Sequence, residues 1–280
     1  MAQITASDVN KLRQITGSGM MDCKNALVEA DGDFDKAIEV LRKRGQKVAA
    51  KRGDREANEG LVVSKTNSAG NHGVITTLTC ETDFVAKNAE FNEVANKIAD
   101  IALASGAKTL EDLKAQSFDG NGLSIADKVL EMIGKIGEKI DVGVLDVIEA
   151  DTVVSYNHPG NQVATLVGLN VSGAPVSEAG RDVAMQIAAM NPVAIDEAGV
   201  SKELIEKEIE IGMELARKEG KPEEMLEKIA QGKLNKFFKE STLLNQAFIK
   251  ENKLSVAQYL KGVDANLTVT AFKRHSVSKS

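Results

Sequence analysis

Over the first 45 residues, apolar positions recur every three or four residues, which is the period of an amphipathic helix. Thr5 or Ser7 is placed to cap a first helix, and Asp33 is placed to cap a third. A glycine follows each predicted helix, at positions 17, 32 and 45. The pattern therefore predicts a bundle of three short helices joined by tight turns.

After this bundle, the apolar residues form short runs rich in β-branched side chains, as strands do. Runs at Leu61–Lys65 and Gly73–Thr79 flank a polar loop, which predicts an antiparallel hairpin. Helical spacing then returns over about 82–105, and again over about 124–140. We expect two strands with helices laid beside them.

A second strand-rich unit follows. We expect strands over residues 142–148, 153–156 and 162–171, a helix over 176–190 and a closing strand over 267–274. The two units resemble a duplicated α+β core, although no convincing sequence repeat supports a duplication.

Residues 201–240 carry two helical stripes separated by E-G-K-P. Gly220 is placed to end the first helix, and Pro222 suits the first turn of the next. The pattern predicts a protruding helical hairpin with a dense charge on its surface. Its apolar stripe is either buried within the hairpin or also available to a partner or a second copy of the chain.

The predicted fold class is therefore α+β: an N-terminal three-helix bundle, a two-part core with antiparallel sheets and an inserted helical hairpin. The predicted divisions are the bundle at 1–53, the first core unit at 54–140, the second core unit at 141–198 and 241–280, and the hairpin at 199–240.

Composition narrows the class of protein. The 280 residues are 42% hydrophobic and 27% charged, as in ordinary soluble globular proteins, and no apolar run is long enough to span a membrane. The N-terminus does not read as a signal peptide, and Cys23 and Cys80 imply no disulfide framework. We expect a cytoplasmic protein without membrane association, and the net charge of −6 argues against extensive nucleic-acid binding.

The stretch Arg42–Arg55 is the exception in charge, because it holds seven basic residues and one acidic residue. Clustered cations neutralise phosphates, so an RNA- or ribosome-associated protein is the alternative function. No aromatic residue interleaves the cations to stack on bases, and glycines interrupt the run. A solvated linker between domains is the favoured interpretation.

Sequence signatures of catalysis and of bound cofactors are missing. The chain has no phosphate-binding G-x-x-x-x-G-K-[ST] motif, no zinc-type spacing of Cys and His, and no calcium-loop pattern. Its three histidines are isolated, and a hydrolase using Cys80 is the weakest hypothesis. We expect a binding protein without cofactor or metal, and not an enzyme.

The strongest candidate for binding is the stretch Cys80–Phe91, C-E-T-D-F-V-A-K-N-A-E-F. Thr82 and Asp83 are good helix caps, so Phe84 and Val85 fall in the first turn of a helix at a strand end. Little surrounds such a position to bury a large ring. Phe84 is therefore either a staple folded onto its own helix or an anchor for a partner.

The motif T-D-F-V-A-K-N, which follows a predicted strand, resembles the signature of the bacterial elongation factor Ts family. A second, independent stretch, L-R-Q-I-T-G-S-G-M-M-D-C-K-N-A-L at Leu12–Leu27, is also close to the opening of that family. The N-terminal bundle resembles a ubiquitin-associated-type module, and the hairpin resembles the family's coiled-coil protrusion. The resemblance extends to about Arg274. The chain stops six residues later, so the C-terminal helical module of some members is not expected.

The resemblance implies a guanine-nucleotide exchange factor for elongation factor Tu. Thr82, Asp83, Phe84 and Val85 would bind that partner and displace its Mg²⁺, with Phe84 as a wedge. Asp83 would either cap its helix or accept a hydrogen bond from the partner. Apart from the resemblance, the apolar stripe of the hairpin raises the hypothesis of a dimer formed through it.

Further contacts with the partner are expected from Arg13, Met20, Met21 and His158. Each has a simpler alternative: Arg13 merely solvated, Met20 and Met21 filling the core of the bundle, and His158 capping a turn. A rival reading of the whole chain is a ubiquitin-associated-type adaptor, in which the N-terminal bundle alone would bind.

Overall fold

The computed structural model describes residues 3–120 and 122–277. Its N-terminal bundle consists of α1 (Ala6–Thr16), α2 (Met20–Glu29) and α3 (Phe34–Arg52). Thr5, and not Ser7, caps α1, and it exchanges hydrogen bonds with Asp8 in a capping box. The expected bundle is confirmed, with a core of small and branched side chains that includes Leu12, Cys23 and Leu27.

The third helix is longer than the sequence indicates. α3 does not end at Gly45 but continues to Arg52, so most of the predicted basic linker is helical. Its second half packs on α7 (Ile125–Ile136). A Cβ atom on Gly45 would lie 2.5 Å from the Leu130 carbonyl oxygen, so glycine here allows two helix backbones to touch. The bundle is therefore joined to the core by a continuous helix.

The first sheet has the order β1-β2-β3 and is antiparallel, formed by β1 (Glu59–Thr66), β2 (His72–Cys80) and β3 (Asp141–Glu149). The hairpin of β1 and β2 is confirmed. The sequence pattern predicts this third strand as part of the second unit, but β3 pairs with β2 and completes the first sheet. Register between strands far apart in sequence depends on tertiary contacts, which explains the wrong assignment.

Helices cover one face of this sheet: α5 (Ala89–Ser105), α6 (Leu110–Ala115) and α7. The apolar positions of α5 that recur at helical spacing, such as Phe91 and Ile98, are fully buried against it. The expected long helix 124–140 is shorter, because it ends at Gly137 in a left-handed conformation.

The second sheet has the order β4-β5-β8 and is also antiparallel, formed by β4 (Thr152–Asn157), β5 (Val163–Leu169) and β8 (Val269–Ser276). The expected strands and the helix α8 (Ala174–Met190) are confirmed. The remaining elements of this unit are a 3-10 turn (Glu197–Gly199), β6 (Ala247–Phe248), β7 (Glu251–Ser255) and α11 (Val256–Val263).

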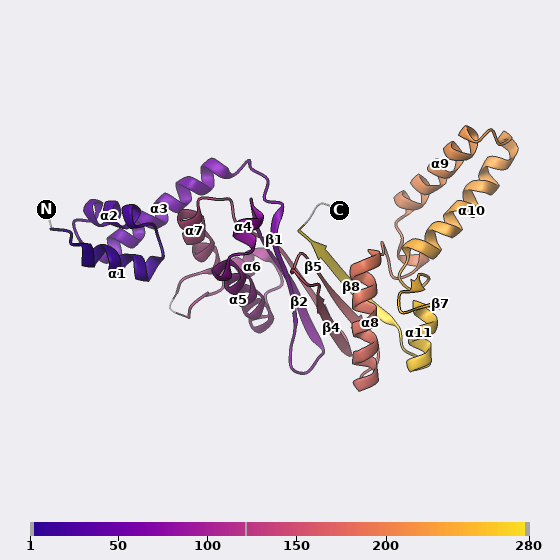
Figure 1. Cartoon of the computed structure of the whole chain (residues 1–280). Helices are drawn as coiled ribbons and strands as arrows, with labels where there is room; N and C mark the ends of the chain where they lie inside the picture. The colour runs from indigo at the N-terminus through magenta and orange to yellow at the C-terminus, as the bar shows by residue number, and fades with distance from the viewer. Residues whose placement is uncertain (1–2, 121, 278–280) are drawn as a thin grey trace.

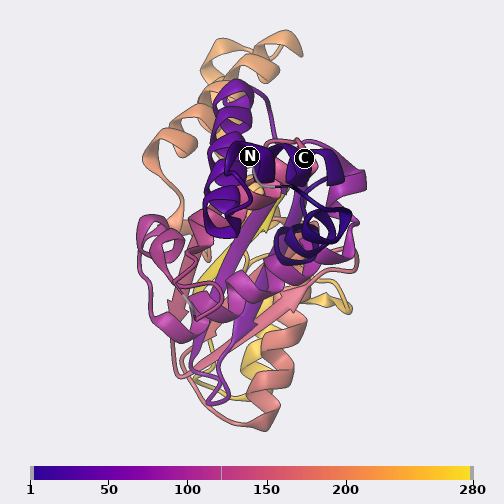
Figure 2. The same ribbon diagram turned by 90° about the vertical axis from the view of Figure 1, so that its left-hand side faces the viewer.

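The two sheets pack against each other through a separate apolar cluster that includes Val62, Ile75 and Leu166. The result is an elongated molecule with the bundle at one end and the second unit towards the other (Figure 1). Turned by 90°, the same molecule shows the bundle in front of the sheets (Figure 2). The predicted α+β class is confirmed.

The predicted hairpin is formed by α9 (Lys202–Lys218) and α10 (Glu223–Ser241) and projects from the second unit (Figure 1). Small residues line its seam, where Gly212 packs against Ala230. Ile211 and Leu215 lie outside this seam and are exposed. Among the described residues, no helix of the fold is both long enough and apolar enough to cross a membrane.

Candidate partner-binding site

The polypeptide leaves β2 at Cys80 and turns into α4 (Asp83–Ala86), a helix of four residues. The chain then turns at Asn88, whose side chain accepts hydrogen bonds from the first turn of α5. The single helix expected from Thr82 to about residue 105 is thus two helices. A break is stable here because Asn92 donates to the carbonyl oxygens of Ala86 and Asn88.

Phe84 projects from α4 into solvent, with 83% of its surface exposed. The staple interpretation is therefore wrong, because a ring folded onto its own helix would be covered. The next two residues hold the helix in place: Val85 packs against the core of the first unit, and Ala86 is buried in it. An exposed ring on an anchored short helix has the form of a binding anchor.

Thr82 is the cap of α4, and Asp83 is not. The Thr82 Oγ1 accepts a hydrogen bond from the Val85 N–H. The Asp83 carboxylate instead pairs with Lys87 at 2.7 Å, and the hydrogen bond from Lys87 holds the pKa of Asp83 below its ordinary value. Asp83 is thus ionised at neutral pH and half exposed, and Thr82 occupies the N-cap position that Asp83 was a candidate for.

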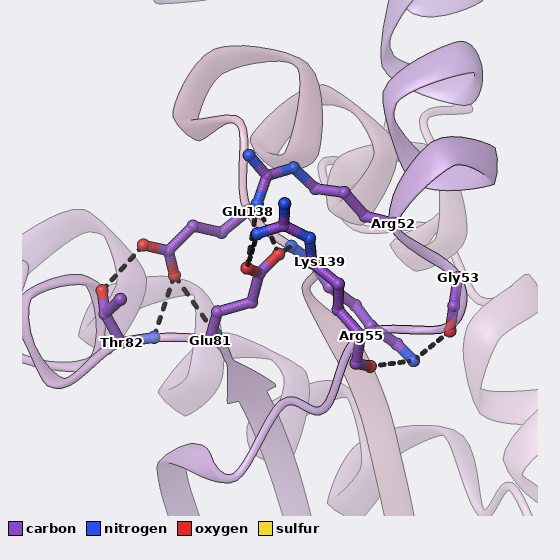
Figure 3. Close-up of polar contacts among 7 residues, drawn as sticks. All are labelled: Arg52, Gly53, Arg55, Glu81, Thr82, Glu138 and Lys139. Atoms are coloured by element: carbon purple, nitrogen blue, oxygen red, sulfur yellow. Dashed lines mark hydrogen bonds and ion pairs between the residues drawn. The ribbon is translucent and has the colours of Figure 1, made fainter.

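Glu138 holds the backbone that precedes α4 (Figure 3). Its Oε2 accepts hydrogen bonds from the backbone N–H groups of Glu81 and Thr82, at 3.1 and 3.0 Å. Its Oε1 accepts from the Thr82 hydroxyl at 2.7 Å. One carboxylate therefore satisfies three donors at a position where the strand ladder has ended.

The carboxylate of Glu81 accepts hydrogen bonds from the segments that follow α7 and α3. Its Oε1 accepts from the Lys139 backbone N–H at 2.6 Å, and its Oε2 accepts from Arg55 at 3.0 Å (Figure 3). Nη1 of Arg52 donates to both carboxylate oxygens, at 2.7 and 2.9 Å. Burial would raise the pKa of Glu81, but these donors outweigh it and lower the pKa to about 2. The Lys139 ammonium in turn donates to the carbonyl oxygens of Gly53 and Arg55.

We refer to this set of contacts between residues 81–82, 138–139 and 52–55 as the carboxylate clamp. Sequence reasoning did not find it. The acidic and basic residues were visible, but nothing in their spacing indicates which of them meet. The only signal was an unexplained basic stretch at the end of a predicted helix.

The other predicted contact residues lie on separate elements. Met20 and Met21 start α2 and are 53% and 64% exposed, so the alternative that they fill the core is wrong. They border a surface groove of ≈ 370 Å³ with residues of α1. Arg13 is exposed on α1.

His158 lies in the exposed turn between β4 and β5, where its Nδ1 is 3.0 Å from the Tyr156 hydroxyl. This turn is attached to the edge of the first sheet, because the Val62 N–H donates to the Asn161 carbonyl oxygen at 2.7 Å. The expected residues are therefore distributed over three surfaces: α4, the bundle and this turn.

Chemistry at Cys80 is disfavoured. Burial, followed by the nearby charge of Glu138, raises the pKa of the thiol to about 12, so the nucleophilic thiolate is absent at neutral pH. Within the described parts of the chain, no group of three or more His, Cys, Asp or Glu side chains is arranged to hold a metal ion.

The fold and the site indicate a class of protein: a binding protein with an exposed aromatic side chain on a turn that hydrogen bonds hold in place. A family model described as "Elongation factor TS" matches residues 81–279. Proteins named "Elongation factor Ts" from Christiangramia forsetii, Amoebophilus asiaticus and Flavobacterium psychrophilum are 57%, 54% and 54% identical to this chain. Each alignment covers 97–98% of this chain and 98% of the relative. The chain belongs to the elongation factor Ts family.

Proposed function

We propose that this protein is a guanine-nucleotide exchange factor for elongation factor Tu, acting in the cytoplasm during translation elongation. The observation that carries the proposal is the exposed Phe84 on α4, within the T-D-F-V-A-K-N stretch and inside the part of the chain that the family model matches. A ring that is exposed in the free protein gains its burial only on binding.

Phe84 acts as a wedge in an apolar cleft of the partner's GTPase domain. Burial of such a ring stabilises the complex by about 1.5–3 kcal/mol. If the ring fits only a partner conformation in which the Mg²⁺ ligands are displaced, that free energy weakens GDP binding. Each tenfold weakening requires about 1.4 kcal/mol, so other contacts must add to Phe84.

The additional contacts come from the bundle and from the second unit. Met20 and Met21 offer a flexible apolar surface, and Arg13 and His158 offer polar groups. Asp83, ionised and beside Phe84, accepts a hydrogen bond from the partner. No covalent step is involved: the protein works by differential binding to two states of its partner.

The alternative of an RNA-binding protein is disfavoured by the structure of the basic stretch. Five of its seven cations, Arg42, Lys43, Arg44, Arg52 and Arg55, form ion pairs with carboxylates of the chain. A cation already paired with a carboxylate must give up that pair to neutralise a phosphate, so these residues gain less from binding nucleic acid. Dimerisation through the hairpin stays a prediction, which analytical ultracentrifugation of the intact chain tests.

The deciding experiment measures release of a fluorescent GDP from elongation factor Tu. The intact chain is expected to accelerate release strongly, and Phe84→Ala is expected to lose at least tenfold of this acceleration. Phe84→Ala should leave the urea midpoint of unfolding unchanged, because the ring is exposed in the free protein. No acceleration by the intact chain would refute the function; full acceleration by Phe84→Ala would refute the wedge.

A further inference from the structure

Phe84 makes little contact with its own protein, so its direction is set by the backbone beneath it. α4 has only four residues, too few for a helix to be stable by itself. Val85 and Ala86 attach its far side to the core. The residues that connect β2 to α4, Glu81 and Thr82, are held by hydrogen bonds from their backbone N–H groups to Glu138.

The Thr82 hydroxyl shows how the carboxylate clamp acts on this helix. The hydroxyl donates a hydrogen bond to Glu138 Oε1, so its oxygen lone pairs are available to accept from the Val85 N–H. A hydroxyl without the carboxylate is free to rotate, and the cap then competes with other orientations. Glu138 therefore orients the residue that caps α4.

The clamp also reaches a second partner surface. Arg52 is the last residue of α3, and the first half of α3 forms the bundle that carries Met20 and Met21. Arg52 meets a carboxylate that is only 12% exposed, and Lys139 holds the carbonyl oxygens just beyond the same helix end. Glu138 and Lys139 directly follow α7 and its C-cap Gly137, and α7 is the helix that packs on α3 at Gly45.

We propose that Glu81 and Glu138 are positioning residues for nucleotide exchange: the carboxylate clamp holds Phe84 in the direction needed for insertion and fixes it relative to the N-terminal bundle. The inference rests on the proposed exchange function. It assigns to two partly buried carboxylates a role in alignment that neither would have if α4 were only a surface turn.

The test uses the full chain with Glu81→Gln, which keeps the shape of the side chain but removes the charge that attracts Arg52 and Arg55. GDP release from elongation factor Tu is measured over a range of factor concentrations. We expect the maximal rate to fall about tenfold, while the half-saturating concentration changes less, because the bundle still binds. Asp100→Asn is the matched control: it breaks the ion pair with Lys65 in the same unit without touching the turn.

A double-variant cycle separates alignment from general damage. If Glu81 acts through Phe84, Glu81→Gln adds little to the loss already caused by Phe84→Ala. If Glu81 only supports the fold, the two losses multiply, and the inference is overturned. Exchange by Glu81→Gln equal to that of the intact chain overturns it as well, while the proposed function stands.

A second pair of variants covers the case in which Glu81→Gln does not fold. Glu138→Gln retains an acceptor for the backbone N–H groups and is expected to lose less of the maximal rate than Glu138→Ala. Equal rates for the two variants, with both folded by circular dichroism, would overturn the inference. Absence of exchange by the intact chain would instead overturn the proposed function, so the two failures are distinguishable.

Discussion

Thr82 and Phe84 are two residues apart and have different roles, one in the fold and one in binding. Phe84 is exposed and contributes its surface to a complex, whereas Thr82 contributes its hydroxyl to the free protein. The hydroxyl both donates to Glu138 and caps α4. A site for a partner is thus built from one residue that the fold leaves uncovered and a neighbour that the fold holds tightly.

This division predicts the effect of removing the hydroxyl. Thr82→Ala should lower the free energy of unfolding by about 1 kcal/mol, the usual cost of losing a helix cap. Thr82→Ser, which keeps the hydroxyl, should lower it much less. Urea denaturation followed by circular dichroism measures both values, and equal losses for the two variants would show that the methyl group and not the cap matters.

At the scale of elements, the length of α3 determines how the N-terminal bundle is connected to the core. Glycine usually weakens a helix interior, so Gly45 looked like a helix end. In the fold, Gly45 faces Gly134 of α7, and the two backbones approach closely at this crossing. A residue that is unfavourable for the isolated helix is therefore required by the packing of two helices.

Substitution by alanine distinguishes local preference from packing. Gly45→Ala should lower the free energy of unfolding by about 1–3 kcal/mol, because the new methyl group meets the Leu130 carbonyl oxygen and this outweighs the gain in helix propensity. Gly232→Ala in α10 is the control. Nothing lies within 4 Å of its Cβ position, so it should raise the free energy of unfolding by up to about 1 kcal/mol. Thermal or urea unfolding should show opposite signs.

At the scale of the whole molecule, the two sheets are joined by more than apolar packing. Asp146 on β3 of the first sheet pairs with His275 and Lys273 on β8 of the second. The hydrogen bond from His275, followed by that from Lys273, outweighs burial and lowers the pKa of Asp146 to about 2. A strand near the end of the chain is thereby attached to a sheet formed much earlier in the sequence.

The direction of this pKa shift gives a pH dependence. Because the pKa of Asp146 is lower in the folded state than its ordinary value of 3.8, the ion pair stabilises the fold above about pH 4. That contribution is lost as the pH falls through the range from about 4 to 2. Between pH 7 and pH 3, the intact chain should lose about 1 kcal/mol more of its unfolding free energy than Asp146→Asn.

Urea denaturation at the two pH values measures this difference. Lys65 and Asp100 form a comparable but more exposed pair, so Asp100→Asn should differ from the intact chain by less. Parallel pH dependence of the intact chain and Asp146→Asn would mean that the link between the sheets contributes nothing to acid stability.

The sequence by itself determined the features that depend on neighbours along the chain. Periodicity located the bundle, the strands of the β1–β2 hairpin, α8 and the helical hairpin, since burial of one face imposes a period of 2 or 3.6. The stretch around Phe84 was found in the same way, because its residues are contiguous. Its position at a strand end left a staple or an anchor as the alternatives for the ring.

Only the tertiary structure decided the features that join distant segments. The pairing of β3 with β2, the passage of α3 through Gly45, and the contact of Glu81 with Arg52 each depend on residues brought together by folding. A local sequence pattern indicates which face of an element is buried but not which other element covers it. The position of a charged residue in the sequence does not indicate which residue it pairs with. For that reason the sequence located the ring of Phe84, while its exposure and the clamp beneath it were decided only by the fold.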